Sequence, residues 1–216
     1  MAGKYHPNVL IVEGDQDKRV IPYLMEANGI TWGEKKEAAV VKIKSYGGYQ
    51  NINTDVISTE LKASGLKALG LIVDADEDLN ARWDSIRNVC IKSIPSLPEE
   101  LPESGLIFHT PLGVKFGIWV MPDNQTPGML ETFLKYLIPD ESETLWQYVQ
   151  EVVPIAKNKG AKYIDNHLDK ACIYAWLALQ NPPGRQLHHA VMEKILDPTH
   201  PKAQTFVNWF KTLYNL

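Results

Sequence analysis

The sequence predicts an α/β fold with a mostly parallel, Rossmann-like sheet flanked by helices, followed by an all-helical extension. Short apolar runs alternate with helix-like segments in the first part of the chain, an order typical of parallel sheets. These runs are continuous rather than alternating, as in strands buried on both faces. From Thr126 onward the signals are helical. We therefore expect an α/β domain at residues 1–138 and a helical extension packed on it at residues 139–216.

The expected elements follow from apolar periodicity and from start and stop signals. Strands are expected at residues 8–12, 38–43, 68–73, 106–109 and 116–121. Helices are expected at residues 15–27, 52–64, 79–92, 141–152, 163–179, 186–195 and 203–213. Thr126 and Pro127 suit the N-cap and first position of one more helix. The last two strands are close enough in sequence to form a hairpin.

Composition limits the classes of function. The chain has 216 residues, 44% hydrophobic content and a formal net charge of −4. This acidic balance argues against sequence-independent coating of DNA or of anionic membranes, although a local basic groove remains compatible with it. Cys90 and Cys172 lie far apart without metal-type spacing, which indicates reduced thiols and a cytoplasmic protein. No apolar stretch approaches the roughly 18 residues of a membrane span.

Acidic residues follow two of the predicted strands. Glu13 comes directly after the first strand, and Asp74, Asp76 and Asp78 follow the third. Ligands bind beyond the carboxyl ends of the strands in open parallel sheets. In an extended segment Asp74 and Asp76 would point the same way. Clustered carboxylates repel one another unless a cation intervenes, and oxygen donors suit Mg²⁺ or Mn²⁺.

Other interpretations of the acidic run remain. An EF-hand is rejected, because Leu79 and Ser85 stand where that loop needs Gly and Glu. An aspartyl-phosphate phosphatase would carry its Asp-x-Asp on the first strand, followed by Gly-Thr. A solvated helix start is the plain alternative, because acids favour first helical turns. The same alternative applies to Glu131, while Asp123 beside Pro122 suits a turn.

The order and spacing of these motifs resemble a known fold. "VLIVEGDQD" and the later "LIVDADED" resemble the TOPRIM signature of a Glu after the first strand and Asp-x-Asp after the third. TOPRIM domains occur in topoisomerases, primases and nucleases of the OLD (overcoming lysogenisation defect) family. A closer resemblance, to a small uncharacterised TOPRIM-like family allied to OLD nucleases, rests on "KSYGGYQNI", "DADEDLNARWDSI" and "MPDNQTPGMLETFL". The resemblance covers about residues 8–138.

The resemblance implies roles for the acidic residues. Glu13 would be a metal ligand or general acid/base, and Asp74 with Asp76 would be the metal-binding pair. Asp17 and Glu131 would match further acids of OLD-type sites. Asp78 completes the set of candidate ligands for one or two Mg²⁺ or Mn²⁺ ions. Two such ions would stabilise both the attacking and the leaving oxygen of a phosphodiester.

Positive groups and a glycine turn complete the predicted site. Arg82 is the candidate to stabilise charge at the reacting phosphate, although it could instead pair with Asp78 at i+4. The Gly47-Gly48 turn resembles one that OLD-like chains place after the second strand, but Tyr49 stands where those chains tend to have Lys. Candidate nucleic-acid contacts are Lys18, Lys44, Gly47, Gly48 and Lys115.

These observations favour a metal-dependent nuclease of TOPRIM type acting on nucleic acid, with DNA the expected substrate, in phage defence or DNA repair. The sequence has no G-x-x-x-x-G-K-[ST] motif, so an ATPase would be a separate chain. A homodimer is left open. The alternative is a TOPRIM-like binding or regulatory subunit without catalysis, and a primase-like nucleotidyl transferase is a weaker third interpretation. If Glu131 faces the other acids, the catalytic interpretation gains.

Overall fold

The computed structural model describes residues 5–33 and 38–216. Within these ranges five strands form one sheet in the order β2-β1-β3-β5-β4. The strands are β1 (Asn8–Val12), β2 (Lys42–Ser45), β3 (Ala68–Asp74), β4 (Leu106–His109) and β5 (Lys115–Met121). The pairs β1–β2, β1–β3 and β3–β5 are parallel, and β4 runs antiparallel to β5. The predicted mostly parallel sheet with a hairpin at its end is confirmed.

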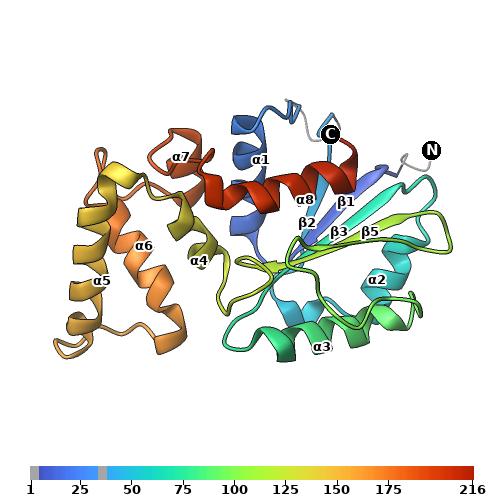
Figure 1. Cartoon of the computed structure of the whole chain (residues 1–216), viewed down its shortest axis with the longest axis horizontal. Helices are drawn as coiled ribbons and strands as arrows, with labels where there is room; N and C mark the ends of the chain where they lie inside the picture. Colours follow the sequence, from blue (N-terminus) through green and yellow to red (C-terminus); the bar gives the residue numbers. More distant parts are fainter. Residues whose placement is uncertain (1–4, 34–37) are drawn as a thin grey trace.

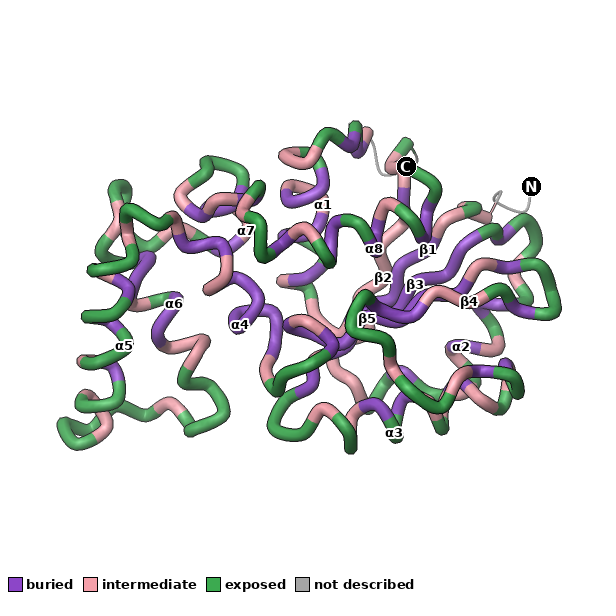
Figure 2. Tube along the Cα trace, in the orientation of Figure 1, coloured by how far each residue is buried: buried purple, intermediate pink, exposed green. Residues whose placement is uncertain are grey.

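Helices cover both faces of the sheet (Figure 1). Helices α1 (Asp15–Ala27) and α8 (Gln204–Tyr214) cover one face, and α2 (Thr54–Leu61) and α3 (Leu79–Ile91) cover the other. Successive side chains of a strand point to opposite faces. In β1, Leu10 therefore packs on the α1 side and Ile11 on the α2–α3 side. Figure 2 shows the central strands buried throughout, which explains their continuous apolar sequence.

The helical extension joins the same core as the sheet. Helix α4 (Leu130–Leu134) precedes the extension, whose helices before α8 are α5 (Glu143–Lys157), α6 (Leu168–Ala178) and α7 (Leu187–Met192). Short 3-10 turns are η1 (Tyr49–Asn51), η2 (Lys135–Leu137), η3 (Asp140–Ser142), η4 (Asp165–His167) and η5 (Pro201–Ala203). Helices α5 and α6 pair beside the sheet (Figure 1). Across the described ranges, no helix is both long and apolar enough to cross a bilayer.

Two glycines let α8 approach the sheet closely. Gly70 in β3 and Gly117 in β5 are partners in the strand register. A Cβ at Gly70 would lie 2.3 Å from the Tyr214 hydroxyl, and one at Gly117 would lie 2.8 Å from Leu213. The Tyr214 hydroxyl donates a hydrogen bond to the Val9 carbonyl at 2.8 Å. The flat strip made by these glycines therefore fixes how α8 closes this face.

The second strand lies later in the chain than predicted. It runs from Lys42 to Ser45 rather than over residues 38–43, and Lys42 is the partner of Val9 in β1. The Val40 N–H donates instead to the Trp32 carbonyl at 2.9 Å. Because Val40 pairs with the preceding segment, residues 38–41 cannot join the sheet. The apolar run therefore marks a packed turn ahead of the strand.

The helix predicted to start at Thr126 and Pro127 begins later, at Leu130. An Asp123 carboxylate oxygen accepts the Thr126 N–H at 2.8 Å, which holds this segment in a turn. Gly128 then exchanges two backbone hydrogen bonds with Asp76, at 2.9 and 2.8 Å. The turn expected at Asp123 is thus present, and the bridge to Asp76 keeps the chain extended until α4 begins.

Candidate metal and phosphate site

A small pocket with acidic walls lies at the carboxyl ends of β1 and β3. We call it the acidic pocket. It has a volume of about 260 Å³ and is lined by Glu13, Asp15, Asp17, Asp74 and Glu131, together with Gly14, Gln16, Gly48, Leu130 and Lys170. β1 and β3 are direct neighbours, so the acids that follow them meet at one edge of the sheet. The structure thus brings together Glu13, Asp17, Asp74 and Glu131 from three separate segments of the chain.

Glu13 and Asp74 are held by backbone N–H groups. The Asp74 N–H donates to Glu13 Oε1 at 2.9 Å, and the Leu130 N–H donates to Asp74 Oδ1 at 3.1 Å. Burial is the main cause that raises the pKa of Glu13. Burial also raises the pKa of Asp74 well above its usual value, helped by the charges of Asp17, Glu13 and Glu131. These carboxylates are therefore oriented, partly desolvated and mutually repelling.

Asp17 lies in the first turn of α1 and is only 6% exposed. Its Oδ2 accepts the Gly14 N–H at 3.3 Å. Burial, with repulsion from Glu13 and Glu131, raises the pKa of Asp17 to about 7. A carboxyl group with such a pKa exchanges its proton near neutral pH and gains from a nearby cation.

Glu131 and Lys170 form an ion pair at the wall of the pocket. Glu131, in the first turn of α4, is 3% exposed, and its Oε1 lies 3.0 Å from Lys170 Nζ. Burial alone would lower the pKa of Lys170, but the Glu131 carboxylate raises it and the net shift is upward. The Lys170 ammonium from α6 therefore offsets part of the pocket's negative charge. Glu131 faces the other acids, as the catalytic interpretation requires.

Asp76 turns away from the acidic pocket. It has a left-handed backbone (φ 54°), so the chain leaves the extended path that would have aimed Asp74 and Asp76 at one point. The Asp76 side chain is 49% exposed and pairs with Arg82, whose side chain is 13% exposed. The Arg82 guanidinium also lies 3.9 Å from the centre of the Tyr49 ring. The predicted pairing of Arg82 with Asp78 is thus replaced by a pairing with Asp76.

Further residues predicted for the site are Gly47, Gly48, Lys18 and Asp78, of which Gly48 lines the pocket. Gly48 lines the pocket and its N–H donates to the Glu13 carbonyl at 2.9 Å, with Gly47 in the same turn. Lys18 is exposed on α1. Asp78 is the N-cap of α3, where its Oδ1 accepts the Ala81 N–H at 3.0 Å.

Two predicted lysine contacts are engaged elsewhere. Lys44 pairs with Glu60 and donates to the Tyr5 hydroxyl at 3.0 Å. Lys115 stands at the opposite end of β5 from the pocket, where it bonds the Thr212 carbonyl at 2.8 Å. The structure therefore does not bring these two side chains to the acids. Lys115 begins β5 at the amino end, whereas the acids lie at the carboxyl ends of the parallel strands.

The carboxylate oxygens of the acidic pocket are suitable ligands for a hard divalent cation. Carboxylate oxygens are the ligands that Mg²⁺ and Mn²⁺ prefer, and desolvated acids of raised pKa gain from a cation. In residues 5–33 and 38–216, no group of three or more His, Cys, Asp or Glu side chains already converges as a metal-binding set. The carboxylates share a pocket, but Lys170 holds Glu131. A cation would therefore compete with Lys170 for this carboxylate.

Sequence reasoning missed Lys170. It lies in α6, 39 residues beyond Glu131, within a segment that reads as an ordinary amphipathic helix. Only the packing of α6 against α4 brings its ammonium to the pocket. Tyr49 departs from the family pattern, in which a Lys tends to stand at this position. Its packing under Arg82 depends on how the Gly48 turn meets α3. No local pattern encodes either contact.

The fold and this pocket define an α/β protein with buried acids at the carboxyl edge of a parallel sheet. The chain belongs to the family described as "Protein of unknown function (DUF3226)", whose model matches residues 7–215. A comparison with curated proteins finds no match.

Solved structures of similar fold span nearly the whole chain. The hypothetical protein PH0156 from Pyrococcus horikoshii OT3 has 18% identity and a TM-score of 0.53, covering 95% of this chain and 94% of that one. The C-terminal region of the Xanthomonas campestris pv. campestris OLD protein has 16% identity and a TM-score of 0.49, covering 98% and 97%. The C-terminal region of the Burkholderia pseudomallei OLD protein has 12% identity and a TM-score of 0.47, covering 97% of this chain and 99% of that one. At 18% identity, the likeness to PH0156 is one of fold alone.

Proposed function

We propose that this protein is a divalent-metal-dependent phosphodiester-processing protein of TOPRIM type, a DNA nuclease that works with a separate ATPase. The observation that carries the proposal is the convergence of four carboxylates on one pocket, with Asp17 and Glu131 buried and Glu13 and Asp74 half-buried. Burying several carboxylates together is costly, and such perturbed groups gather at functional sites. The resemblance of the Glu13 and Asp74 motifs to the TOPRIM signature supports the same function.

In this proposal the acidic pocket holds one or two Mg²⁺ or Mn²⁺ ions. Glu13, Asp17, Asp74 and Glu131 are the proposed ligands, and Asp76 would become available once Arg82 releases it. Asp78 is the weaker candidate because its carboxylate already caps α3. A bound divalent ion supplies Lewis-acid activation of a phosphate ester.

Cationic side chains of this protein are proposed to interact with the phosphates of the nucleic acid. Lys170, once released from Glu131, presents an ammonium at the pocket wall. Arg82 is held by Asp76 and Tyr49 within the neighbouring segment, which keeps its guanidinium ordered. Ordered cations stabilise the negative charge that develops on a reacting phosphate. Lys18, exposed on α1 directly after Asp17, is proposed to contact the nucleic-acid strand outside the pocket.

Nicking of supercoiled plasmid tests the proposal. The wild type should nick DNA with Mg²⁺ or Mn²⁺ and not with EDTA. Asp74→Asn should abolish nicking, since it removes a buried charge and keeps an oxygen for the Leu130 N–H. Asp84→Asn, which changes an exposed acid on α3, should keep full activity. Metal-independent nicking, or equal activity in both variants, would refute the assignment of the site.

The second candidate function is a TOPRIM-like binding or regulatory subunit without catalysis. It is favoured by the two ion pairs, Lys170–Glu131 and Arg82–Asp76, which neutralise part of the acidic charge without any cation. DNA binding by a folded, metal-loaded protein that never nicks the plasmid would support this candidate. In that case any cutting would fall to a partner chain.

A further inference from the structure

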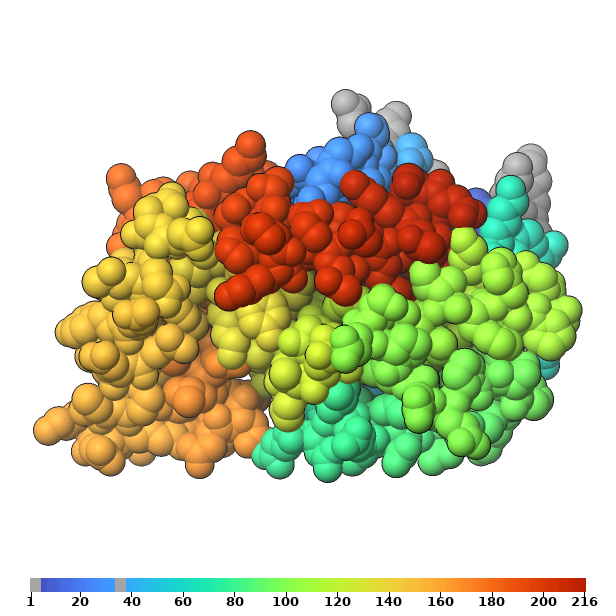
Figure 3. All heavy atoms as spheres, viewed as in Figure 1, coloured from blue at the N-terminus to red at the C-terminus, as the bar shows by residue number. Residues whose placement is uncertain are grey.

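A second, larger hollow lies next to the acidic pocket. It has a volume of about 540 Å³ and lies between the start of α3 and the segment around η4. We call it the α3–η4 groove. Its walls include Asp76, Arg82, Ser85, Met129, Ile164 and His167. Figure 3 shows its position as a notch between the atoms around η4 and those at the start of α3. The volume suits a small organic group, because ligand pockets usually have about 300–1,000 Å³.

The groove continues from the acidic pocket on two of its walls. Asp74 lines the pocket, and the next two residues, Ala75 and Asp76, line the groove. Met129 lines the groove, and the next residues, Leu130 and Glu131, line the pocket. A ligand with a phosphate at the acids would therefore place its adjoining group in the groove.

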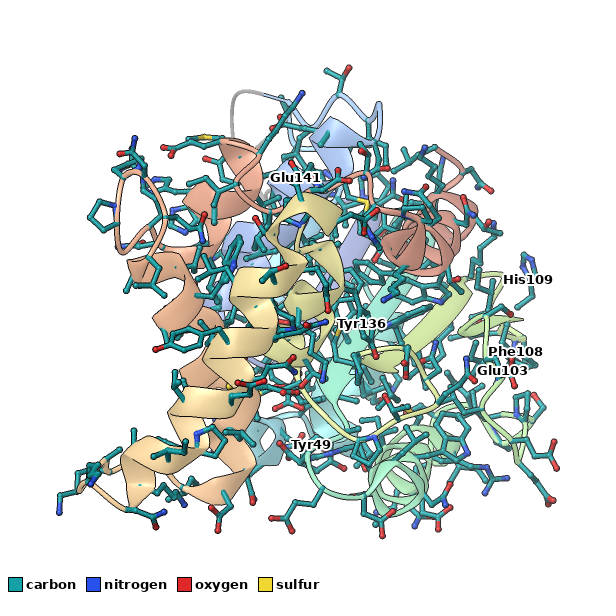
Figure 4. The ribbon with its side chains drawn as sticks, turned by 60° about the vertical axis from the view of Figure 1, so that its left-hand side comes forward. Tyr49, Glu103, Phe108, His109, Tyr136 and Glu141 are labelled. Atoms are coloured by element: carbon teal, nitrogen blue, oxygen red, sulfur yellow. The ribbon has the colours of Figure 1, made fainter. Side chains whose placement is uncertain are left out.

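Arg82 gives the groove a flat, ordered wall. Tyr49 stacks on its guanidinium at 3.9 Å, and Asp76 pairs with it. The Tyr49 hydroxyl is hydrogen-bonded to Ser85 Oγ at 2.5 Å, which fixes the ring against α3. Figure 4 labels Tyr49 in the region between the α5–α6 pair and α3. A planar guanidinium held in this way is a surface on which a flat aromatic ring can stack.

The η4 side of the groove presents one exposed apolar side chain beside the polar Asn166 and His167. Ile164, which directly precedes η4, is 57% exposed. Met129 and Ala75 close the groove toward the core, where they are 7% and 2% exposed. A flat ligand in the groove would thus contact the Arg82 guanidinium and the exposed Ile164 side chain. Sequence-tolerant binding of nucleobases uses this combination of stacking and apolar contact.

The charges of the groove disfavour a phosphate and suit the edge of a base. The charge of Asp76 is matched by Arg82, and Asp78 is engaged in capping α3. Glu77 remains as an exposed acceptor. Carboxylates accept hydrogen bonds from the exocyclic amino groups of bases and repel phosphate oxygens. Away from Arg82, whose charge also acts on Glu13 of the acidic pocket, the groove is therefore complementary to the base of a nucleotide rather than to its phosphate.

We propose that the α3–η4 groove binds an unpaired nucleobase, and that the nucleic acid recognised here is single-stranded or frayed next to the phosphate at the acidic pocket. The first part stands on the groove itself, and the second rests on the function proposed above. A base in a duplex is stacked and paired, so only an unpaired one can enter a pocket between protein walls.

Fluorescence anisotropy that compares strands with and without unpaired bases tests this proposal. The probe is a labelled single strand of about 12 deoxycytidines, a length within the usual range of such sites. An abasic strand of equal length keeps the phosphates and loses the bases, and a duplex of equal length pairs them. Binding is measured in EDTA and again with Ca²⁺. The variants are Ile164→Asp in the groove and Ile155→Asp, a similarly exposed isoleucine on α5.

Wild type should bind the deoxycytidine strand more tightly than the abasic strand or the duplex, by on the order of fivefold or more for one stacked base. In Ile164→Asp the ratio of the affinities for the deoxycytidine strand and the abasic strand should fall to nearly one. In Ile155→Asp this ratio should stay as in the wild type. No preference in the wild type, or equal loss in both variants, would overturn the proposal. Failure of the proposed metal function would look different, with no response to Ca²⁺ and no nicking while the base preference persists.

Discussion

Asp74 is the residue on which the acidic pocket centres. Its carboxylate accepts the Leu130 N–H at 3.1 Å, and its own N–H holds Glu13 at 2.9 Å. One residue thus links the ends of β1 and β3 to the start of α4. Because burial and four neighbouring acids raise its pKa, Asp74 gains from any cation that reaches the pocket.

Asp17 makes stability fall as the pH rises in metal-free buffer. Its folded-state pKa, about 7, lies above the ordinary 3.8, so the native state binds the proton more tightly between these values. Ionisation on raising the pH therefore destabilises the fold. Asp17→Asn should raise the free energy of unfolding at pH 8 by about 1–4 kcal/mol and have little effect near pH 4.

Urea unfolding at both pH values measures this effect. Asp15→Asn, in the same helical turn but exposed, is the matched control and should change stability little at either pH. An Asp17→Asn variant that is less stable than wild type at pH 8 would contradict the account.

Lys170 should stabilise the metal-free protein through Glu131. Lys170→Met leaves the buried Glu131 carboxylate unpaired, so the free energy of unfolding at pH 8 should fall. The Lys170 side chain is 41% exposed, which limits the loss to about 1–2 kcal/mol. Adding Glu131→Gln should restore much of the loss in denaturant titrations. Additive losses in the double variant would show that the two side chains are not coupled.

At the scale of elements, the glycine strip under α8 sets how closely this helix packs. Gly117→Ala would place a methyl group 2.8 Å from Leu213, and overpacking of this kind costs about 1–3 kcal/mol. Thermal unfolding of Gly117→Ala, Leu213→Ala and the double variant measures the coupling. The double variant should be more stable than the sum of the single losses predicts. Strict additivity would mean that α8 shifts freely on the sheet.

The elements differ in how far the sequence reveals them. The buried strands β1, β3 and β5 follow from continuous apolar runs, and their parallel order follows from the intervening helices. The edge strand β2 was misplaced because its residues, "KIKS", carry no apolar run. The start of α4 was misplaced because long-range hydrogen bonds between Gly128 and Asp76 override a good local capping signal.

The meeting of Glu13 and Asp74 could be predicted from the sequence, whereas the positions of Asp76 and Lys170 could not. Strand ends fix where Glu13 and Asp74 must lie, so their meeting follows from the topology. The left-handed turn at Asp76 and the arrival of Lys170 depend on tertiary contacts with α3, α4 and α6. The same contacts decide which acids share the pocket and which ones line the groove.

At the scale of the whole molecule, the sheet and the helical extension share one core. A single cluster of buried residues runs from Leu10 in β1 through Trp119 and Phe206 to Trp176 in α6. Helix α8, close to the C-terminus, covers a face of the sheet to which β1, close to the N-terminus, contributes Leu10. The boundary predicted near residue 139 therefore separates two parts that complete each other's packing.

A fragment of residues 1–138 should consequently fail to fold. It would lose α8 and expose the face of the sheet that contains Leu10 and Trp119. We expect no cooperative unfolding transition in denaturant and no near-UV circular dichroism signal, while the full chain shows both. A cooperative transition of the fragment would show that the α/β part is an independent domain.

The measurement that tests the central claim most directly is calorimetric titration of the metal-free protein with Mn²⁺ at pH 7. Wild type should bind and release protons, seen as heats that vary with the buffer, because Asp17 is partly protonated there. Asp74→Asn should abolish binding, while Asp84→Asn, which changes an exposed acid on α3 outside the pocket, should bind as wild type does. Absence of binding by the wild type at millimolar Mn²⁺, or equal binding by Asp74→Asn, would contradict the assignment of the acidic pocket as a metal site.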